Sequence, residues 1–384
     1  MRLTGFINLL FCMQLSYHAI AQDPEIVDWS DATQLPLLSG KPHPGLAGPV
    51  TGIHNNILLI AGGANFPDGL PWEGGKKKYH SAIYLYDLSS GKPTYLFTVD
   101  HLSTPLAYSA SCNTSHGIVT AGGENSEGLS ATVCLFTVNP LTKAVATQYL
   151  PALPIPTTNA VAVSSNQSIY FIGGETAAGT TAACWKLDLN HLEVGWKSIA
   201  PLPLPLAYSS AVLMDFPDHP QVVVLGGRRK TVSGVSDISP SVYAYNLKED
   251  KWEQKHSLPY PVSAGTAFAA GKSTLFFLGG DKAETFTQVE QTHTAIAVAA
   301  ETEKPALINK KNKLLASHPG FGKEILRYDV ESGKSAIAGL IPFPSPVTTT
   351  ALIHQDMIIL PSGEIRAGVR TPAILTATIK SRLK

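Results

Sequence analysis

A carboxylate flanked by two arginines is the part of this sequence best suited to chemistry. Glu364, Arg366 and Arg370 lie within residues 361–372, where glycine and proline predict a short loop. A carboxylate can act as a general base, and the planar guanidinium of arginine pairs with carboxylates through two hydrogen bonds. Two interpretations stay open: a catalytic Glu364 beside an arginine that holds an anionic ligand, or a structural glutamate–arginine clamp that fixes the loop.

Polar and charged residues also recur directly after a repeated glycine doublet. The residues at this place are Glu124, Glu175, Arg228, Asp281 and Glu364. A second set follows proline-rich segments and comprises Tyr108, Asn159 and Tyr208. If the repeats share one structure, these side chains meet around one axis, and a funnel of polar groups is a default binding site. We expect Glu124, Glu175, Arg228, Arg366 and Tyr108 to bind substrate. For each, a solvated or capping loop residue is the alternative.

The doublets belong to a repeat that runs along the whole chain. The first glycines are Gly62, Gly122, Gly173, Gly226 and Gly279, at intervals of 60, 51, 53 and 53 residues, and residues 357–363 form a degenerate sixth copy. Each unit contains a proline-rich segment and reads as four short strands, a period typical of kelch-type blades. A lone four-stranded sheet cannot bury both faces, so the units must stack radially. The repeat predicts an all-β, six-bladed kelch-type β-propeller.

The two ends of the chain are predicted to meet in the last blade. The sixth unit has three strands, and residues 26–30 resemble the fourth strand of a unit, so the N-terminal strand would close the last blade. This arrangement makes residues 22–384 one domain. An insertion at about residues 281–323 interrupts the fifth blade, and residues 304–317 can form an amphipathic helix. Two interpretations of this insertion stay open: it is a lid over the channel, or it is an elaboration that packs on the rim of the propeller.

Composition limits the classes of partner. The chain has 384 residues with 29 Lys+Arg and 29 Asp+Glu, so its formal net charge is zero. A basic surplus would be expected for a protein that binds nucleic acid or an anionic membrane. Beyond the N-terminus no apolar run reaches the roughly 20 residues of a membrane span. No residue cluster predicts a metal site, and we expect no cofactor.

Residues 1–21 have the pattern of a signal peptide. Arg2 precedes an apolar stretch that ends in Ala19-Ile20-Ala21, which a signal peptidase would cleave before Gln22. The mature protein is therefore predicted to be exported, soluble and periplasmic. It keeps three cysteines, which we expect to be small buried hydrophobes, with one disulfide as the alternative: Cys112, Cys134 and Cys184.

Residues 363–371, Gly-Glu-Ile-Arg-Ala-Gly-Val-Arg-Thr, together with the repeats resemble the bacterial N-acetylneuraminate epimerases, or sialic acid mutarotases. Two further matches are residues 61–66 running on to 77–85, and residues 107–109 leading to Gly122-Gly123-Glu124. The matches occur in rotated order, which resembles a cyclically permuted group of mutarotases. The resemblance implies that Glu364 and Arg370 are catalytic, with Arg366 in the basic position.

The resemblance implies an isomerase that interconverts the α and β anomers of N-acetylneuraminate, an acidic sugar. A carboxylate with an acid or a relayed water suffices for ring opening and closure, and a cation, Arg370 or Arg366, would hold the sugar carboxylate. The alternative is a non-catalytic propeller that binds glycans or a protein. A sialidase is disfavoured because its Ser-x-Asp-x-Gly-x-Thr-Trp repeats are missing from the sequence.

Overall fold

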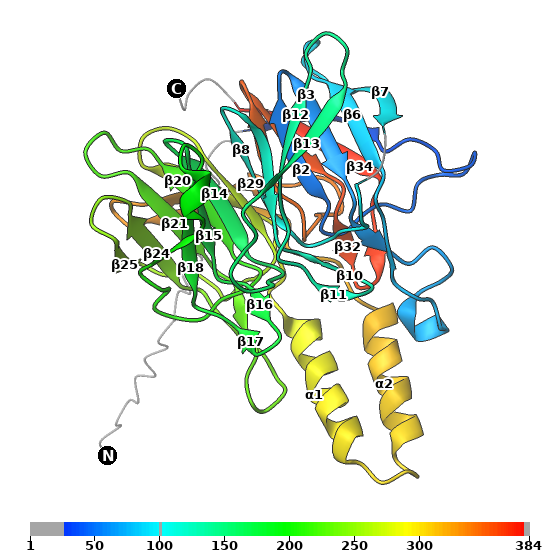
Figure 1. The fold of residues 1–384 in the computed structure, drawn as a ribbon. Helices are drawn as coiled ribbons and strands as arrows, with labels where there is room; N and C mark the ends of the chain where they lie inside the picture. Colours follow the sequence, from blue (N-terminus) through cyan, green and yellow to red (C-terminus); the bar gives the residue numbers. More distant parts are fainter. Residues whose placement is uncertain (1–26, 100–101, 380–384) are drawn as a thin grey trace, which may run out of the picture.

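Six four-stranded antiparallel sheets are arranged radially in the part of the chain that the structure, a computed structural model, describes, residues 27–99 and 102–379 (Figure 1). Blade one contains β2 (Val50–His54), β3 (Ile57–Ala61), β6 (Ile83–Asp87) and β7 (Thr94–Val99). Blade two contains β8 (Ala110–Thr114), β9 (Gly117–Ala121), β12 (Val133–Val138) and β13 (Val145–Leu150). Blade three contains β14 (Val161–Ser165), β15 (Ser168–Ile172), β18 (Cys184–Asp188) and β19 (Lys197–Ile199).

The second half of the chain repeats this order. Blade four contains β20 (Ser210–Met214), β21 (Gln221–Leu225), β24 (Val242–Asn246) and β25 (Lys251–Lys255). Blade five contains β26 (Thr266–Ala269), β27 (Thr274–Leu278), β28 (Glu324–Asp329) and β29 (Ser335–Leu340). Blade six contains β30 (Leu352–His354), β31 (Met357–Pro361), β34 (Ala373–Ile379) and β1 (Val27–Gln34). The predicted six-bladed propeller is confirmed.

The last blade is closed by the N-terminal strand, as predicted. β1 pairs antiparallel with β34, from Val27 opposite Ile379 to Gln34 opposite Ala373. Without β1, β34 would be an exposed edge strand. The predicted signal peptide, residues 1–21, lies outside the described residues.

The hydrophobic core lies between neighbouring sheets. Each contact between adjacent blades is filled by its own cluster of buried aliphatic and aromatic side chains, including the contact between blades six and one. Cys112, Cys134 and Cys184 are free thiols within these layers. Burial raises the pKa of each thiol, to about 12, 11 and 12 respectively. They therefore act as small hydrophobic residues, as expected, and no disulfide joins them.

Short hairpins extend five of the described blades on one face, directly after the glycine doublet. The hairpin strands are β4 (Ala64–Asn65) and β5 (Lys78–Tyr79), β10 (Glu124–Asn125) and β11 (Gly128–Leu129), β16 (Glu175–Thr176) and β17 (Gly179–Thr180), β22 (Arg228–Arg229) and β23 (Asp237–Ile238), β32 (Glu364–Arg366) and β33 (Val369–Arg370). Two short 3-10 turns are η1 (Pro71–Glu73) and η2 (Leu192–Val194).

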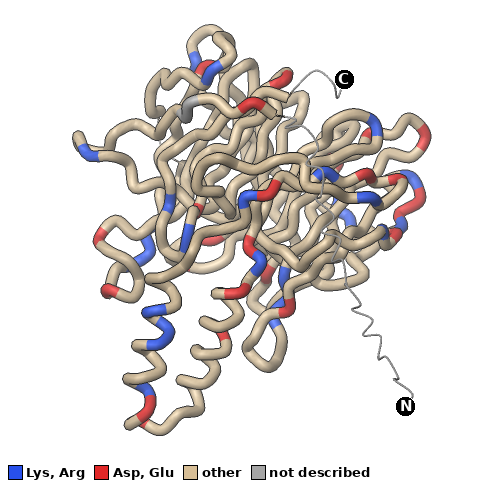
Figure 2. The backbone as a smooth tube through the Cα atoms, turned by 180° about the vertical axis from the view of Figure 1, so that it is seen from behind, with Lys and Arg blue, Asp and Glu red and all other residues tan. Residues whose placement is uncertain are grey.

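In blade five a pair of helices replaces the short hairpin. α1 (Glu284–Val298) and α2 (Lys304–Ala316) project from the propeller on the face that carries the other hairpins (Figure 1). α2 confirms the helix predicted at residues 304–317, whereas α1 was not anticipated. Basic and acidic residues are both spread over the loops (Figure 2), in keeping with the zero formal net charge, whereas α1 carries only Glu among its Lys, Arg, Asp and Glu positions and α2 only Lys.

Candidate active site

The glycine doublet fixes the backbone next to each polar ring position. The first glycine has a positive φ, 68° at Gly122, and a Cβ there would lie 2.2 Å from the carbonyl oxygen of Thr157 in the next blade. A side chain is therefore excluded at that contact. The residue after the doublet then forms a β-bridge with its own blade's leading segment, as Glu124 does with Ala107 and Glu364 does with Val347.

Six residues, one per blade, form a closed ring of backbone hydrogen bonds around the axis. We call it the axial ring, and its members are Gly48, Tyr108, Asn159, Tyr208, Ala264 and Thr348. Each N–H donates to the carbonyl of the preceding member over 2.7–3.2 Å, with Gly48 donating to Thr348, and every φ lies between 54° and 59°. Two of the predicted site residues, Tyr108 and Tyr208, and Asn159 thus share one structural position.

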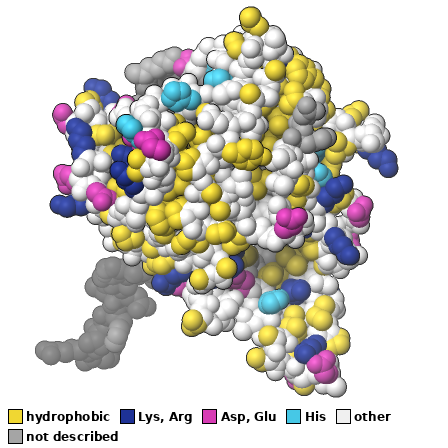
Figure 3. Space-filling view, in the orientation of Figure 1, with side chains coloured by type: hydrophobic (Ala, Val, Ile, Leu, Met, Phe, Trp, Pro, Cys, Tyr) yellow, Lys and Arg dark blue, Asp and Glu magenta, His cyan; other side chains and the backbone are white. Residues whose placement is uncertain are grey.

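A pocket of about 410 Å³ opens between the propeller and the helical pair. Its polar lining comes from blades four to six and includes Tyr208, Arg228, Asp281, His318, Glu364 and Arg370. Its apolar lining comes from blade one and the insertion and includes Phe66, Trp72, Phe286, Val289, Leu315 and Phe321. Hydrophobic side chains gather where the helices meet the propeller (Figure 3). The insertion therefore forms a wall of the pocket.

Glu364 lies in the wall of this pocket at the start of β32. Its Oε1 accepts a hydrogen bond of 2.8 Å from the N–H of Gly368, and its Oε2 lies 3.5 Å from Nη2 of Arg370. Burial raises the pKa of Glu364, and the Arg370 charge and the Gly368 hydrogen bond oppose that rise. The side chain keeps 19% of its surface exposed. It is a carboxylate more basic than usual that a ligand can still reach.

Arg370 is the buried cation of the pair. Only 4% of its side chain is exposed, and its guanidinium lies 4.6 Å from the ring centroid of Phe66. Nε and Nη1 are buried without a hydrogen-bond partner among the described residues. Because buried donors are normally satisfied, these two nitrogens indicate a place for an acceptor from a ligand.

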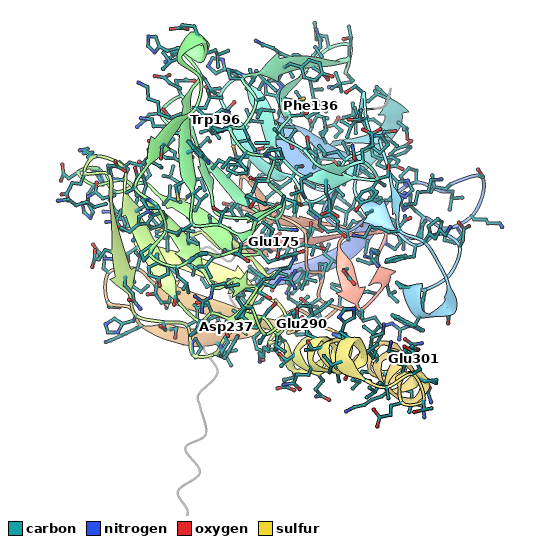
Figure 4. The ribbon with its side chains drawn as sticks, turned by 60° about the horizontal axis from the view of Figure 1, so that its bottom comes forward. Phe136, Glu175, Trp196, Asp237, Glu290 and Glu301 are labelled. Carbon is teal, nitrogen blue, oxygen red and sulfur yellow. The ribbon has the colours of Figure 1, made fainter. Side chains whose placement is uncertain are left out.

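Arg228 is a second cation on the same pocket. Its guanidinium lies between two rings, 4.1 Å from the centroid of Tyr208 and 4.8 Å from that of Phe286. Its Nη2 lies 3.6 Å from Oε1 of Glu175, which Lys230 also approaches at 3.4 Å. Glu175 lies near the centre of the propeller (Figure 4) and is not among the residues lining the pocket. Glu175 therefore contacts Arg228, and its predicted role in substrate binding stays a prediction.

The other predicted site residues lie outside the pocket lining. Glu124 accepts a 2.7 Å hydrogen bond from the hydroxyl of Tyr79 and is 3.3 Å from Nζ of Lys77. Arg366 is exposed on β32. Tyr108 lies in the axial ring, where burial raises the pKa of its hydroxyl to about 12 and the Arg370 charge opposes that rise. The roles assigned to these three residues stay predictions.

Sequence reasoning missed the pocket residues that occur only once in the chain. His318 follows α2, Phe286 and Val289 lie on α1, and Trp72 lies in η1. None of them occupies a repeated position, so no spacing pattern marks them. A lone His-Pro-Gly segment after the predicted helix was the only signal for His318.

The fold and the site define a β-propeller whose pocket combines a carboxylate of raised pKa, the buried Arg370, the half-buried Arg228 and an apolar wall. The family model of N-acetylneuraminate epimerase matches residues 150–383, more than half of the chain, and the chain belongs to this family. The match includes Arg228, Asp281, His318, Glu364 and Arg370.

Individual relatives are more distant. N-acetylneuraminate epimerase 1 of Escherichia coli O6:H1 (strain CFT073) is 28% identical over 230 residues, which is 58% of each chain. N-acetylneuraminate epimerase of Yersinia pestis is 24% identical over 251 residues, 64% of this chain and 61% of the relative. The match thus spans about three fifths of these relatives' length. A solved structure named YjhT has a TM-score of 0.61 at 15% identity and covers 91% of this chain and 97% of its own, which supports the fold.

Proposed function

We propose that this protein is a mutarotase that interconverts the α and β anomers of N-acetylneuraminate. The observation that carries the proposal is the Glu364–Arg370 pair, in which a carboxylate of raised pKa lies beside a buried guanidinium with two unpaired nitrogens. One group suits removal of a proton, and the other suits an anionic sugar. Family membership and the names of the relatives support the same substrate.

The reaction needs a base, an acid and room for the open chain. Glu364 removes the proton of the anomeric hydroxyl, the carbon–oxygen bond to the ring breaks, and the ring oxygen takes up a proton. Rotation next to the new carbonyl and reclosure from its other face give the other anomer, with each proton returned. A base whose pKa is raised toward neutral pH accelerates such a step more than an ordinary glutamate would.

Arg370 has two tasks in this proposal. Its free nitrogens bind the sugar carboxylate, and its Nη2 keeps Glu364 oriented and ionised enough to act as a base. Arg228 gives the pocket a second donor group that Tyr208 and Phe286 hold by stacking. Arg366 would contribute only long-range attraction from its exposed position.

The apolar wall gives the pocket its selectivity for a sugar with a nonpolar substituent. Trp72, Phe286 and Phe321 line the same pocket as the charged groups. A sugar that carries an acyl methyl group can place it against these rings while its carboxylate meets Arg370. A simple neutral hexose lacks both features.

We further propose that residues 22–384 act as one exported, periplasmic domain after cleavage of residues 1–21. The support is the apolar stretch followed by Ala19-Ile20-Ala21. Within residues 27–99 and 102–379, no helix is long and apolar enough to cross a membrane.

NMR exchange spectroscopy tests the activity directly. The rate of anomer exchange is measured for N-acetylneuraminate and for a panel of neutral sugars, with and without the protein. We expect the protein to accelerate anomer exchange of the acidic sugar only. Binding of N-acetylneuraminate without acceleration would favour the alternative, a propeller that binds glycans and uses Glu364–Arg370 as a structural clamp.

A further inference from the structure

Arg228 is a cation of the pocket that a blade and the insertion hold together. In blade four, Arg228 forms a β-bridge with Ala207, the residue before Tyr208. Its guanidinium lies over the ring of Tyr208 at 4.1 Å and over that of Phe286, on α1, at 4.8 Å. Because aromatic rings lie against its faces, the planar group presents its N–H donors to a ligand at its edge.

The donors of Arg228 are not fully satisfied by the protein. Nε is buried without a hydrogen-bond partner among the described residues. Oε1 of Glu175 lies 3.6 Å from Nη2, which exceeds the length of a hydrogen bond. The side chain keeps 14% of its surface exposed and lines the pocket. Since buried donors normally find an acceptor, Arg228 indicates a place for an acceptor that a ligand supplies.

The charges around Arg228 are balanced. Glu175 contacts it, and Lys230 lies 3.4 Å from the same carboxylate oxygen. Asp281 lines the same pocket, and the charge of Arg228 opposes the rise that burial causes in the pKa of Asp281. Two cations thus face two carboxylates, and a further anion beside Arg228 would meet two like charges. An uncharged acceptor suits this place better.

The Glu364–Arg370 pair has more positive charge around it. Arg366 lies on the same hairpin as both residues, and the charge of Lys77 opposes the rise that burial causes in the pKa of Glu364. Two buried nitrogens of Arg370 are unpaired among the described residues. A ligand carboxylate is therefore best placed at Arg370, which leaves Arg228 for a neutral group.

Apolar side chains lie next to the donors of Arg228. Phe286 both stacks on its guanidinium and lines the pocket. Val289, one turn further along α1, and Leu315 of α2 line the pocket as well. A ligand group that fits here carries an acceptor oxygen directly beside a small apolar group. An acylamino group has this form, since its carbonyl oxygen and its methyl share one carbon atom.

The insertion is attached to the hairpin that carries Arg228. Residues 230–236 join β22 to β23 and form a longer loop than residues 126–127 or 177–178 in blades two and three. Glu290 of α1 accepts hydrogen bonds from the N–H and the hydroxyl of Ser236, at 2.7 and 2.9 Å. Glu290 lies near the propeller and Glu301 at the far end of the helices (Figure 4). This attachment fixes Phe286 relative to Arg228.

Resting on the proposed function, we infer that Arg228 and Phe286 form a subsite that recognises the acylamino group of the sugar. An N–H of Arg228 donates to the amide carbonyl, the methyl group packs on Phe286, and Arg370 holds the carboxylate. The repeated blades supply the two arginines, and the insertion supplies the apolar surface. A sugar with a hydroxyl in place of the acylamino group loses both contacts of the subsite.

The test compares the binding of three acidic sugars to the whole protein by calorimetric titration. They are N-acetylneuraminate, its N-glycolyl analogue and the analogue with a hydroxyl in place of the acylamino group. The hydroxyl analogue should bind the wild type about 10- to 100-fold more weakly, the scale of one hydrogen bond to a charged donor. The N-glycolyl analogue keeps the carbonyl and should lose only about threefold, because an apolar wall rejects an added hydroxyl weakly.

Variants of the two residues assign the preference to the subsite. Arg228→Met, made together with Glu175→Gln so that no buried carboxylate loses its partner, should weaken N-acetylneuraminate about tenfold or more. The hydroxyl analogue should change little, so the preference between the two sugars disappears. Phe286→Leu should reduce the preference in part. Arg229→Met, at the next position of β22 and outside the pocket lining, is the matched control and should keep the preference.

The preference between sugars separates recognition from a structural role, because a damaged fold weakens both sugars alike and lowers the melting temperature. Equal binding of N-acetylneuraminate and the hydroxyl analogue to the wild type would overturn the inference, as would an unchanged preference in the Arg228 variant. Anomer exchange, measured in parallel, separates the two proposals. Exchange without preference leaves the mutarotase proposal standing, whereas preference without exchange leaves the subsite standing and removes the catalysis.

Discussion

Blades two and six place a glutamate at the same position of the repeat but give it different surroundings. Glu124 bridges to Ala107 and Glu364 bridges to Val347, each directly after the doublet. The partner of Glu124 across its hairpin is Leu129, whereas the partner of Glu364 is Arg370. Two residues of blade one also contact the carboxylate of Glu124: Tyr79 donates a hydrogen bond to it, and Lys77 forms an ion pair with it. The repeat fixes the backbone position of each glutamate. The residues around the side chain, which differ between the two blades, determine whether the carboxylate is available to a ligand.

The two blades also differ in how the chain builds them. Blade two is one continuous stretch from β8 to β13, whereas blade six takes its outer strand from the N-terminus. In blade six the first position of the doublet is Ser362 rather than glycine. The Glu364–Arg370 pair thus lies in a blade in which both the strand closure and the doublet depart from the repeat.

The largest difference between the blades is expected in catalysis. Glu364→Gln removes the base while keeping size, so the exchange rate should fall about 10² to 10⁴-fold. Glu124→Gln, at the same repeat position, should lower the rate far less than Glu364→Gln because Glu124 does not line the pocket, and a loss of affinity would support its predicted role in substrate binding. NMR exchange rates and substrate affinity are measured for both. Equal losses would mean that the whole ring, and not blade six, carries the activity.

The outer strand gives the next largest difference. Deletion of residues 22–35 removes β1, exposes the edge of β34 and uncovers the apolar surface that Val27 and Leu35 bury. Burial of such side chains contributes about 1.5–3 kcal/mol each, so the melting temperature should fall by roughly 10 °C or more. A synthetic peptide of residues 27–35 should restore part of the loss. An unchanged melting temperature would contradict the closure.

Blade six has Arg370 opposite its glutamate, whereas blade two has Leu129. Substitution of Arg370 tests whether this cation binds the sugar. Arg370→Lys keeps the charge but loses Nε and Nη1, so affinity for N-acetylneuraminate should fall about tenfold or more. Titration with a neutral sugar should reveal a smaller change. Leu129→Ala, at the corresponding place in blade two, is the control and should leave affinity unchanged. Equal losses for both sugars, with a lower melting temperature, would support the structural clamp instead.

The repeat explains why the fold could be predicted and the pocket only in part. Gly62, Gly122 and Gly173 mark one backbone geometry that recurs, so blade number and closure follow from spacing. Glu364 and Arg370 were found because they lie on a short hairpin, where neighbours in sequence are neighbours in space. Periodicity therefore gave the frame, and the local motif at residues 361–372, with its resemblance to the epimerases, gave the central pair.

The remaining pocket residues could not be found because their contacts are not local. α1 contains threonine, glutamine and histidine among its apolar residues, so its pattern is weak, and its single copy repeats nowhere. Phe286 contacts Arg228 from 58 positions further along the chain, and His318 enters the pocket lining only after both helices. Arg366 is exposed whereas Arg370 is buried, a difference that the sequence alone does not reveal.

The smallest effect should come from the modified doublet itself. Ser362 has φ 61° and is fully buried, and its hydroxyl accepts from the N–H of Leu46 at 2.8 Å and donates to the carbonyl of Thr371 at 2.6 Å. Ser362→Ala keeps the Cβ and leaves that N–H unpaired, which should destabilise the fold by about 1–3 kcal/mol. Urea unfolding measures the change.

Two companion variants identify the cause of that loss. Ser362→Gly also loses the hydroxyl but relaxes the positive φ, so it should destabilise less than Ser362→Ala. Gly122→Ala in blade two should destabilise at least as much as Ser362→Ala, because its new Cβ meets the carbonyl of Thr157. If neither Gly122→Ala nor Ser362→Ala lowered the stability, the doublet would not be needed for close contact between blades. If Ser362→Gly lowers the stability as much as Ser362→Ala does, the loss of stability comes from the hydrogen bonds alone.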